Sequence, residues 1–166
     1  MNTNTWTRFI KRIPINSNIE KIYKAWATQA GLESWFLRKA EFTYAGENLR
    51  DKNEFVESGD KFEWMWYGWC DDVVEKGKIL EANGKDFIKF TFGKAGIVNV
   101  QIKTEENENI VELTQEEIPV DEESKFNFYV GCGEGWTFYL ANLKSILEGG
   151  IDLRNKNIKL TRVINS

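Results

Sequence analysis

The chain has 166 residues, of which 42% are hydrophobic and 14% aromatic. A chain of this length is typical of one domain and buries roughly 70% of its unfolded surface on folding. The net charge of −4 argues against nucleic acid as a partner, because phosphate binding needs clustered Lys and Arg. We expect a single domain over residues 1–166, with a core of about 5–150 and a tail over 151–166.

The sequence contains no histidine and only two cysteines. Catalytic sites of the Ser-His-Asp, Cys-His and HExxH types are therefore excluded, and the commonest ligand of zinc and copper is absent. Cys70 and Cys132 are too few for a disulfide framework, so we expect two free thiols. The acidic pairs do not match a calcium-binding loop. We expect no cofactor and no metal.

The amino-acid sequence also shows no signal for membrane insertion or export. No apolar stretch of membrane-spanning length, no polybasic run and no apolar signal-peptide core can be found in the sequence. We therefore expect a cytoplasmic protein without membrane insertion.

The N-terminal quarter is predicted to form one strand and two helices. Loose alternation over Trp6–Ile13 indicates a strand that Pro14 ends. Ser17 and Glu20 have the spacing of a capping box, which predicts a helix over Ile19–Ala27. Thr28 can cap a second, shorter helix. The inner side of that second helix would carry Leu32, Trp35 and Phe36.

The middle of the chain is predicted to be a run of antiparallel strands. Alternating apolar residues with short turns between them are typical of a meander rather than of parallel βαβ units. A polar stretch over Gly46–Asn53 lacks this alternation and reads as a surface loop. The predicted strands are centred on Ala40–Tyr44, Phe62–Trp66, Val73–Glu81, Ile88–Phe92, Val98–Ile102 and Val111–Gln115.

A long amphipathic helix is predicted near the C-terminus. Trp136, Leu140, Leu143 and Leu147 share one face at helical spacing, and Gly149-Gly150 ends the helix. Before it, Phe126, Phe128 and Val130 suggest a short edge strand, and Gly131–Gly135 suggests a flexible turn. After it, alternation over Ile158–Ile164 suggests a final extended segment. One such helix after many strands favours an α+β fold in which a curved sheet grips the helix.

Three motifs stand out along the chain. They are Trp26-Ala27-Thr28 followed by Gly31-Leu32 and Trp35-Phe36; Gly59-Asp60-Lys61-Phe62; and Gly135-Trp136 with Leu140, Asn142-Leu143-Lys144 and Leu147-Glu148-x-Gly150. Together they resemble the START-like (SRPBCC) superfamily, specifically the branch named after activators of the ninety-kilodalton heat-shock chaperone ATPase. They occur in the family's order and cover the chain to Arg154. Gln29-Ala30 departs from the Pro-Glu that is frequent in the family, which changes the chemistry of that turn and leaves the fold expectation intact.

The resemblance implies a helix-grip fold: a curved antiparallel sheet wrapped around the C-terminal helix, two short helices between the first two strands, and a cavity between sheet and helix. Members bind lipids, polyketides, hormones or other hydrophobic molecules. We therefore expect a small hydrophobic molecule as the partner, without a need for catalysis. The residues expected to contact it are Trp64, Trp66, Phe90, Phe92, Val100, Leu113, Gln115, Trp136, Tyr139, Leu140 and Leu143. The alternative is that these residues form a filled core with no cavity.

Two other functions stay open. A minority of the superfamily are cyclases or hydrolases, and such an enzyme could use Glu117, Tyr139 or Tyr67 as a proton carrier in the cavity. Stimulation of a chaperone ATPase is less favoured, because the sequence shows no second, N-terminal domain that could clamp a chaperone. A homodimer is compatible with such a domain, and the sequence does not fix the oligomeric state.

Overall fold

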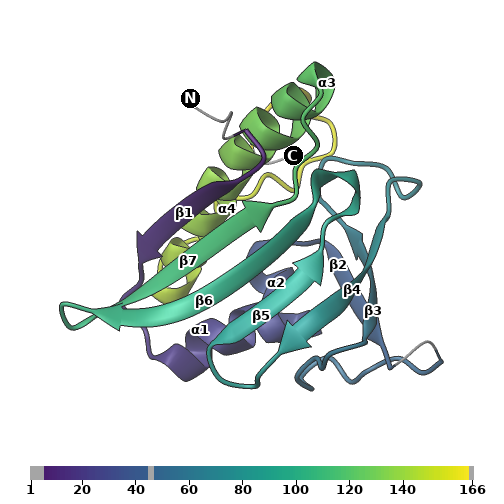
Figure 1. The fold of residues 1–166 in the computed structure, drawn as a ribbon. Coiled ribbons are helices and arrows are strands. Elements are labelled where there is room, and N and C mark those ends of the chain that lie inside the picture. Colours follow the sequence, from purple (N-terminus) through teal and green to yellow (C-terminus); the bar gives the residue numbers. More distant parts are fainter. Residues whose placement is uncertain (1–5, 45–46, 165–166) are drawn as a thin grey trace.

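The computed structural model describes residues 6–44 and 47–164. Its centre is a curved antiparallel sheet of seven strands in the order β1-β7-β6-β5-β4-β3-β2, which confirms the predicted meander (Figure 1). The helices lie on one face of this sheet, with the long C-terminal helix α4 (Gly131–Leu147) packed against β1 and against α2 (Figure 1). The strands are β1 (Phe9–Pro14), β2 (Lys39–Thr43), β3 (Lys61–Met65), β4 (Glu75–Ala82), β5 (Phe87–Thr91), β6 (Ile97–Glu105) and β7 (Glu108–Glu116).

Both predicted N-terminal helices are present, with one change of cap. Helix α1 spans Ile19–Ala27 and α2 spans Gln29–Trp35. The prediction of Ser17 as the first cap is wrong, because the side chain of Asn18 accepts the hydrogen bond from the Lys21 amide at 2.8 Å. Asn caps as well as Ser does, so the capping pattern was displaced by one residue.

The turn between α1 and α2 explains why the chain needs a small residue there. Thr28 Oγ1 accepts a hydrogen bond from the Gly31 amide at 2.9 Å and donates one to the Lys24 carbonyl, also at 2.9 Å. A Cβ on Gly31 would lie 2.1 Å from that same carbonyl oxygen, so only glycine fits. The indole of Trp35 then donates to the Ala25 carbonyl at 2.9 Å. The first motif therefore builds a close corner between two helices.

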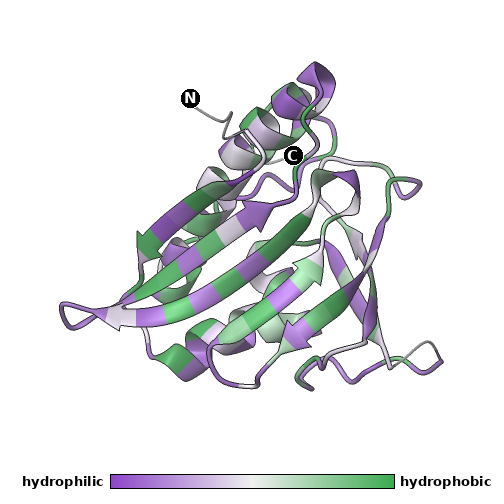
Figure 2. Ribbon diagram, viewed as in Figure 1, coloured by the Kyte–Doolittle hydropathy of each residue, from purple (hydrophilic) through white to green (hydrophobic). Residues whose placement is uncertain are grey.

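Alternation along the strands separates the core face from the solvent face. Figure 2 shows hydrophobic and hydrophilic residues alternating along β5, β6 and β7. Val98, Val100 and Ile102 are buried on β6, while the residues between them are partly exposed. The β6–β7 hairpin turns at Glu106 and Asn107, which both have positive φ, as a two-residue primed turn requires.

Strand β1 is shorter at its start than predicted and includes Pro14. It begins at Phe9, and Pro14 is its last residue, opposite Ile110 of β7. β1 lies at the edge of the sheet, where a proline that donates no hydrogen bond is tolerated. Gly46, the predicted start of the polar loop, lies outside the described residues.

The helical run before α4 overturns two predictions. Residues 122–147 are helical without a break: α3 (Glu122–Ser124), the π-helix η2 (Lys125–Val130) and then α4. Phe126–Val130 is therefore not a strand, and Gly131–Gly135 is not a turn. Asp121 begins the run, because its side chain accepts the Ser124 amide at 2.9 Å. The cap and the continuous backbone ladder outweigh the low helix propensity of three glycines.

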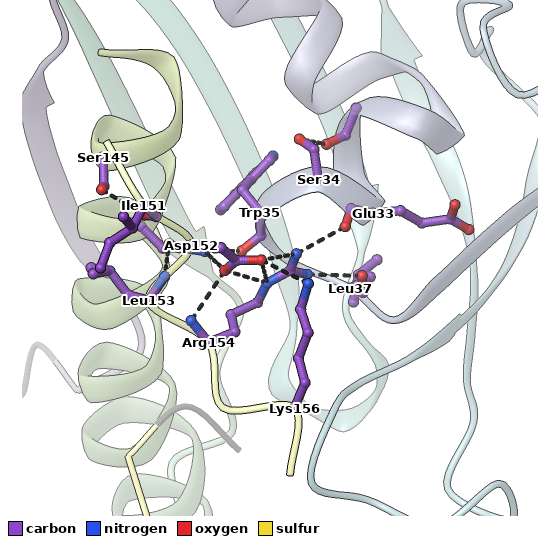
Figure 3. A network of polar contacts seen from close by, with 12 residues as sticks. Glu33, Ser34, Trp35, Leu37, Ser145, Ile151, Asp152, Leu153, Arg154 and Lys156 are labelled. Atoms are coloured by element: carbon purple, nitrogen blue, oxygen red, sulfur yellow. Dashed lines mark hydrogen bonds and ion pairs between the residues drawn. The ribbon is translucent and has the colours of Figure 1, made fainter. Parts of the chain in front are cut away.

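The tail after α4 is held by a polar network instead of a strand (Figure 3). Arg154 donates to the carbonyls of Leu37 and Glu33 at 3.0 Å each and to Asp152 at 2.8 Å. Asn142 of α4 receives the Leu153 amide at 2.7 Å and donates to the Trp35 carbonyl at 2.7 Å. The predicted extended segment over Ile158–Ile164 is absent from the described part of the chain, and Ile158 is exposed.

Candidate functional site

A pocket of about 500 Å³ lies between the first half of α4 and the end of the sheet where β3 and β5 finish and β4 begins. We call it the aromatic pocket. Its wall includes η2, the segment 66–74 between β3 and β4, and Phe36 just after α2. The lining residues are Phe36, Trp66, Trp69, Val73, Glu75, Phe92, Asn127, Phe128, Gly131, Cys132, Gly135, Trp136 and Tyr139.

The pocket wall is built from aromatic rings that contact one another. Phe36 stacks on Trp136 with ring centroids 4.9 Å apart, and it meets Tyr139 edge to face at 5.0 Å. Phe92 lies 5.6 Å from Trp136 on the sheet side. Edge-to-face and offset contacts of this kind stabilise ring pairs by about 0.5–1.5 kcal/mol beyond burial. The rings thus hold each other in place around the space.

Trp136 is oriented by a buried amide. Its indole Nε1 donates to Gln115 Oε1 at 2.9 Å, and Gln115 Nε2 donates to the Ala95 carbonyl at 3.0 Å. Both side chains are buried, and Gln115 is fully so. Gln115 therefore points inward from β7. Gln115 does not line the pocket itself, but it is bonded to Trp136, which does.

Glycines make room for the pocket on the helix side. Helical spacing places Phe128, Cys132, Gly135 and Tyr139 on one face of the helical run. A Cβ on Gly135 would meet no atom within 4 Å. A glycine inside a helix costs about 0.5–1 kcal/mol relative to alanine, and here it leaves open space instead of permitting a close contact. A π-helix, such as η2 beside this face, is also frequent at functional sites.

The segment 66–74 forms the outer rim of the pocket. Trp69 and Val73 are exposed and line the pocket from outside the sheet. Arg38 anchors this segment, because its side chain donates to Asp71 at 2.8 Å and its backbone amide donates to the Met65 carbonyl at 2.8 Å. The rim is thus bonded to Arg38, the residue directly before β2.

Glu75 brings a carboxyl group into this apolar wall. It lies opposite Trp64 on β3 and shares the inner face of β4 with Gly77 and the buried Ile79. Burial raises the pKa of its carboxyl group. Among the described residues, no hydrogen bond or ion pair to this carboxyl group is found. Its neighbour is Gly93, where a Cβ would lie 2.5 Å from Glu75 Oε1.

The other ionisable side chains of the pocket are weak acids. Burial raises the pKa of the Cys132 thiol, with a smaller lowering by a hydrogen bond from Gln115 and a further rise from the Glu75 charge. Burial also raises the pKa of Tyr139 to about 12. Both groups are therefore neutral near pH 7, and Cys132 is a poor nucleophile in this state. Cys70 is exposed, and both cysteines are free, as predicted.

The predicted contact residues divide into two groups in the structure. Trp66, Phe92, Trp136 and Tyr139 line the aromatic pocket. The other apolar ones lie in the packed core next to it and do not line it, because rings fill that part of the sheet: Trp64 packs 5.1 Å from Phe90. That core group is Trp64, Phe90, Val100, Leu113, Leu140 and Leu143. Contact of any of the eleven residues with a ligand stays a prediction.

The proton carriers considered from the sequence are mostly elsewhere. Glu117 is exposed and adopts a positive φ of 59°, so the strand ends before it. Tyr67 faces Arg154 at 5.3 Å, away from the pocket lining. The sequence reasoning missed Glu75. The signal was present in the sequence. Alternate residues of a strand face the same side, so Ile79, Gly77 and Glu75 share the inner face of β4.

A sequence model for "Activator of Hsp90 ATPase homolog 1-like protein" matches residues 16–148. The chain belongs to this family. The assignment confirms the START-like resemblance and covers every element of the aromatic pocket. No curated protein matches the sequence.

Solved structures of the same shape support the fold. Protein SSP2350 from Staphylococcus saprophyticus has a TM-score of 0.68 at 20% identity, over 89% of this chain and 96% of that one. The Aha1 dimer from Colwellia psychrerythraea gives 0.65 at 21% identity, over 86% and 97%. Protein NE0264 from Nitrosomonas europaea gives 0.67 at 10% identity, over 89% and 97%. At these identities the likeness establishes the helix-grip fold alone.

The described residues contain neither a membrane-spanning helix nor a cluster of metal-ligating side chains. Within residues 6–44 and 47–164, no helix has the length and apolar character needed to cross a membrane. Over the same ranges, no cluster of three or more Cys, Asp or Glu side chains is placed to hold a metal ion.

Proposed function

We propose that this family member binds a small, largely hydrophobic molecule in the aromatic pocket. The observation that carries this proposal is a pocket of about 500 Å³ whose wall consists mainly of aromatic side chains. Volumes of roughly 300–1,000 Å³, apolar walls and a few polar groups are typical of small-molecule sites. The pocket's position between sheet and C-terminal helix supports the proposal, because the superfamily resemblance implies a cavity there.

The chemistry of the pocket favours binding over catalysis. An acid–base or nucleophilic mechanism needs a titratable group held by a hydrogen-bonded partner. Of the described lining residues, Cys132 and Tyr139 have raised pKa values that keep them neutral, and Glu75 has no charged partner. An aromatic wall with one carboxyl group is better suited to recognising a ligand than to transforming it.

The remaining partner expectations stay predictions. The Colwellia neighbour is described as a dimer, and a homodimer of the present chain can be tested by sedimentation velocity. A chaperone partner is tested by adding the chain to the chaperone and measuring its ATPase rate. The cytoplasmic location is tested by fractionation.

Native mass spectrometry of freshly purified protein tests the binding function. We expect an adduct of small mass that disappears after denaturing extraction and refolding, and that returns when the extract is added back. A protein that carries no adduct, and that binds no apolar compound when a library is added, would contradict the proposal.

A further inference from the structure

Glu75 is an unusual group for an apolar pocket. Among the described lining residues it alone carries a carboxyl group. Within residues 6–44 and 47–164, thirteen ion pairs are formed and none of them involves the carboxyl group of Glu75. A carboxyl group that is partly buried without a partner is costly, because burial penalises its charged form.

The position of Glu75 is imposed by the strand. Its backbone pairs with Trp64, and Gly77 two residues later has the ring of Phe62 in the space where a side chain would lie, with a Cβ-to-ring distance of 2.4 Å. The inner face of β4 is therefore set by the packing of Phe62. Gly93, at φ 53°, gives the carboxyl group room on its other side. The carboxyl group thus lies at the pocket wall and is partly buried.

The aromatic rings add a second attraction of the same sign. The face of an indole or phenyl ring carries partial negative charge and attracts a cation within about 6 Å of its centroid. Trp66, Trp136 and Phe92 line the same pocket as Glu75. A carboxylate and several aromatic rings around one space are the groups that recognise ammonium ions.

We propose that the aromatic pocket selects an organic cation, in which an apolar body fills the aromatic part and an amine or quaternary ammonium group pairs with Glu75; this rests on the binding function proposed above. The cation would supply the partner that the carboxyl group lacks. An uncharged ligand of the same shape would leave Glu75 buried beside it without a counter-ion. An anionic ligand would meet a like charge.

Three water-soluble compounds with one common body test the selection. Phenylbutylamine, phenylbutanol and phenylbutanoate differ in the end group, which is cationic, neutral or anionic at pH 7. Calorimetric titration at fixed ionic strength gives their dissociation constants. We expect the amine to bind at least about tenfold more tightly than the alcohol, and the alcohol more tightly than the carboxylate, because charge-assisted hydrogen bonds are the strong ones.

Two variants assign the selection to Glu75. Glu75→Gln keeps the shape of the side chain and removes its charge. In this variant the affinity for the amine should fall to within about twofold of the affinity for the alcohol, and the affinity for the alcohol should change by no more than about twofold. Glu81→Gln is the matched control, because Glu81 lies on the same strand and is exposed. It should leave the order of the three compounds unchanged.

The outcomes separate this inference from the binding function. Equal binding of the three compounds, or tightest binding of the carboxylate, would overturn the cation selection and leave the pocket a binding site. The same holds if a neutral naphthyl probe binds while none of the three does. If neither the probe nor any compound binds, the binding function itself fails. The comparison on the wild-type chain decides the matter even if Glu75→Gln does not fold.

Discussion

Trp136 and Gln115 are joined by a buried hydrogen bond of 2.9 Å between α4 and β7. Gln115 continues the connection to the turn η1 (Gly93–Ala95) through the Ala95 carbonyl. One amide therefore links the C-terminal helix, the sheet and the turn next to Glu75. Because Trp136 lines the aromatic pocket, this link sets the position of a pocket wall.

Replacing Gln115 by leucine should destabilise the fold. The change leaves the Trp136 indole N–H and the Ala95 carbonyl buried without their partner, at a cost of about 1–3 kcal/mol. Urea unfolding followed by circular dichroism measures it. Combining the change with Trp136→Phe removes one of the two groups left without a partner. The double variant should therefore lose less unfolding free energy than the sum of the losses in the two single variants. Strict additivity would mean that the hydrogen bond is not formed.

Trp136→Ala and Leu143→Ala should separate pocket from core. Both residues are buried on α4, and only Trp136 lines the pocket. We expect losses of about 3–5 and about 2–5 kcal/mol of unfolding free energy, respectively. Binding of a neutral apolar probe should weaken only in Trp136→Ala. Leu147 is partly exposed, so Leu147→Ala should cost less than Leu143→Ala. Equal weakening of probe binding in all three variants would contradict this division.

Asp152→Asn should remove a pH-dependent contribution to stability. Burial opposes ionisation of Asp152, yet hydrogen bonds from Arg154, Lys156 and Asn142 lower the pKa of its carboxyl group below the ordinary 3.8. A depressed folded pKa stabilises the protein above the unfolded value, and this contribution is lost as pH falls through the folded value. The variant should lose about 1.5–3 kcal/mol at pH 7. The gap to wild type should narrow as pH falls below about 4.

Glu75→Gln should stabilise the protein at pH 7, whereas Asp152→Asn should destabilise it. Burial raises the pKa of Glu75, so the folded chain holds that proton more tightly than the unfolded chain does. Its contribution is favourable at low pH and is lost as pH rises through the folded value. Removing the charge should therefore raise the melting temperature at pH 7 in the absence of ligand. At pH 3 the variant and the wild type should melt alike. A lower melting temperature at pH 7 would show that the carboxylate has a stabilising partner.

Much of the fold could be predicted because its patterns are local. The alternation over Val98–Ile102 and the helical spacing of Trp136, Leu140 and Leu143 each point to one element and one face. Phe126, Phe128 and Val130 misled because their period of two matches a strand, whereas the backbone continues as a π-helix. Three glycines in five residues hid the start of α4, since propensity is a weak guide once tertiary packing acts.

The pocket was harder to predict than the fold. Strand faces identify inward residues, but whether an inward ring packs on another ring or borders open space depends on all its neighbours. Phe62 and Trp64 stack with centroids 3.9 Å apart and fill their part of the sheet. Gly135 leaves space because it has no side chain, and no periodicity marks such a position. Glu75 was overlooked because a charged residue on an inner face runs against the usual pattern.

The central claim is that the space beside Gly135 binds a ligand, and a titration with a neutral naphthyl fluorophore tests it most directly. Gly135→Ala adds a methyl group in open space and should stabilise the helix by about 0.5–1 kcal/mol while preserving binding. Gly135→Leu should keep the fold and lower probe affinity by at least about tenfold, because its side chain fills the pocket. Unchanged affinity in a folded Gly135→Leu protein would contradict the account.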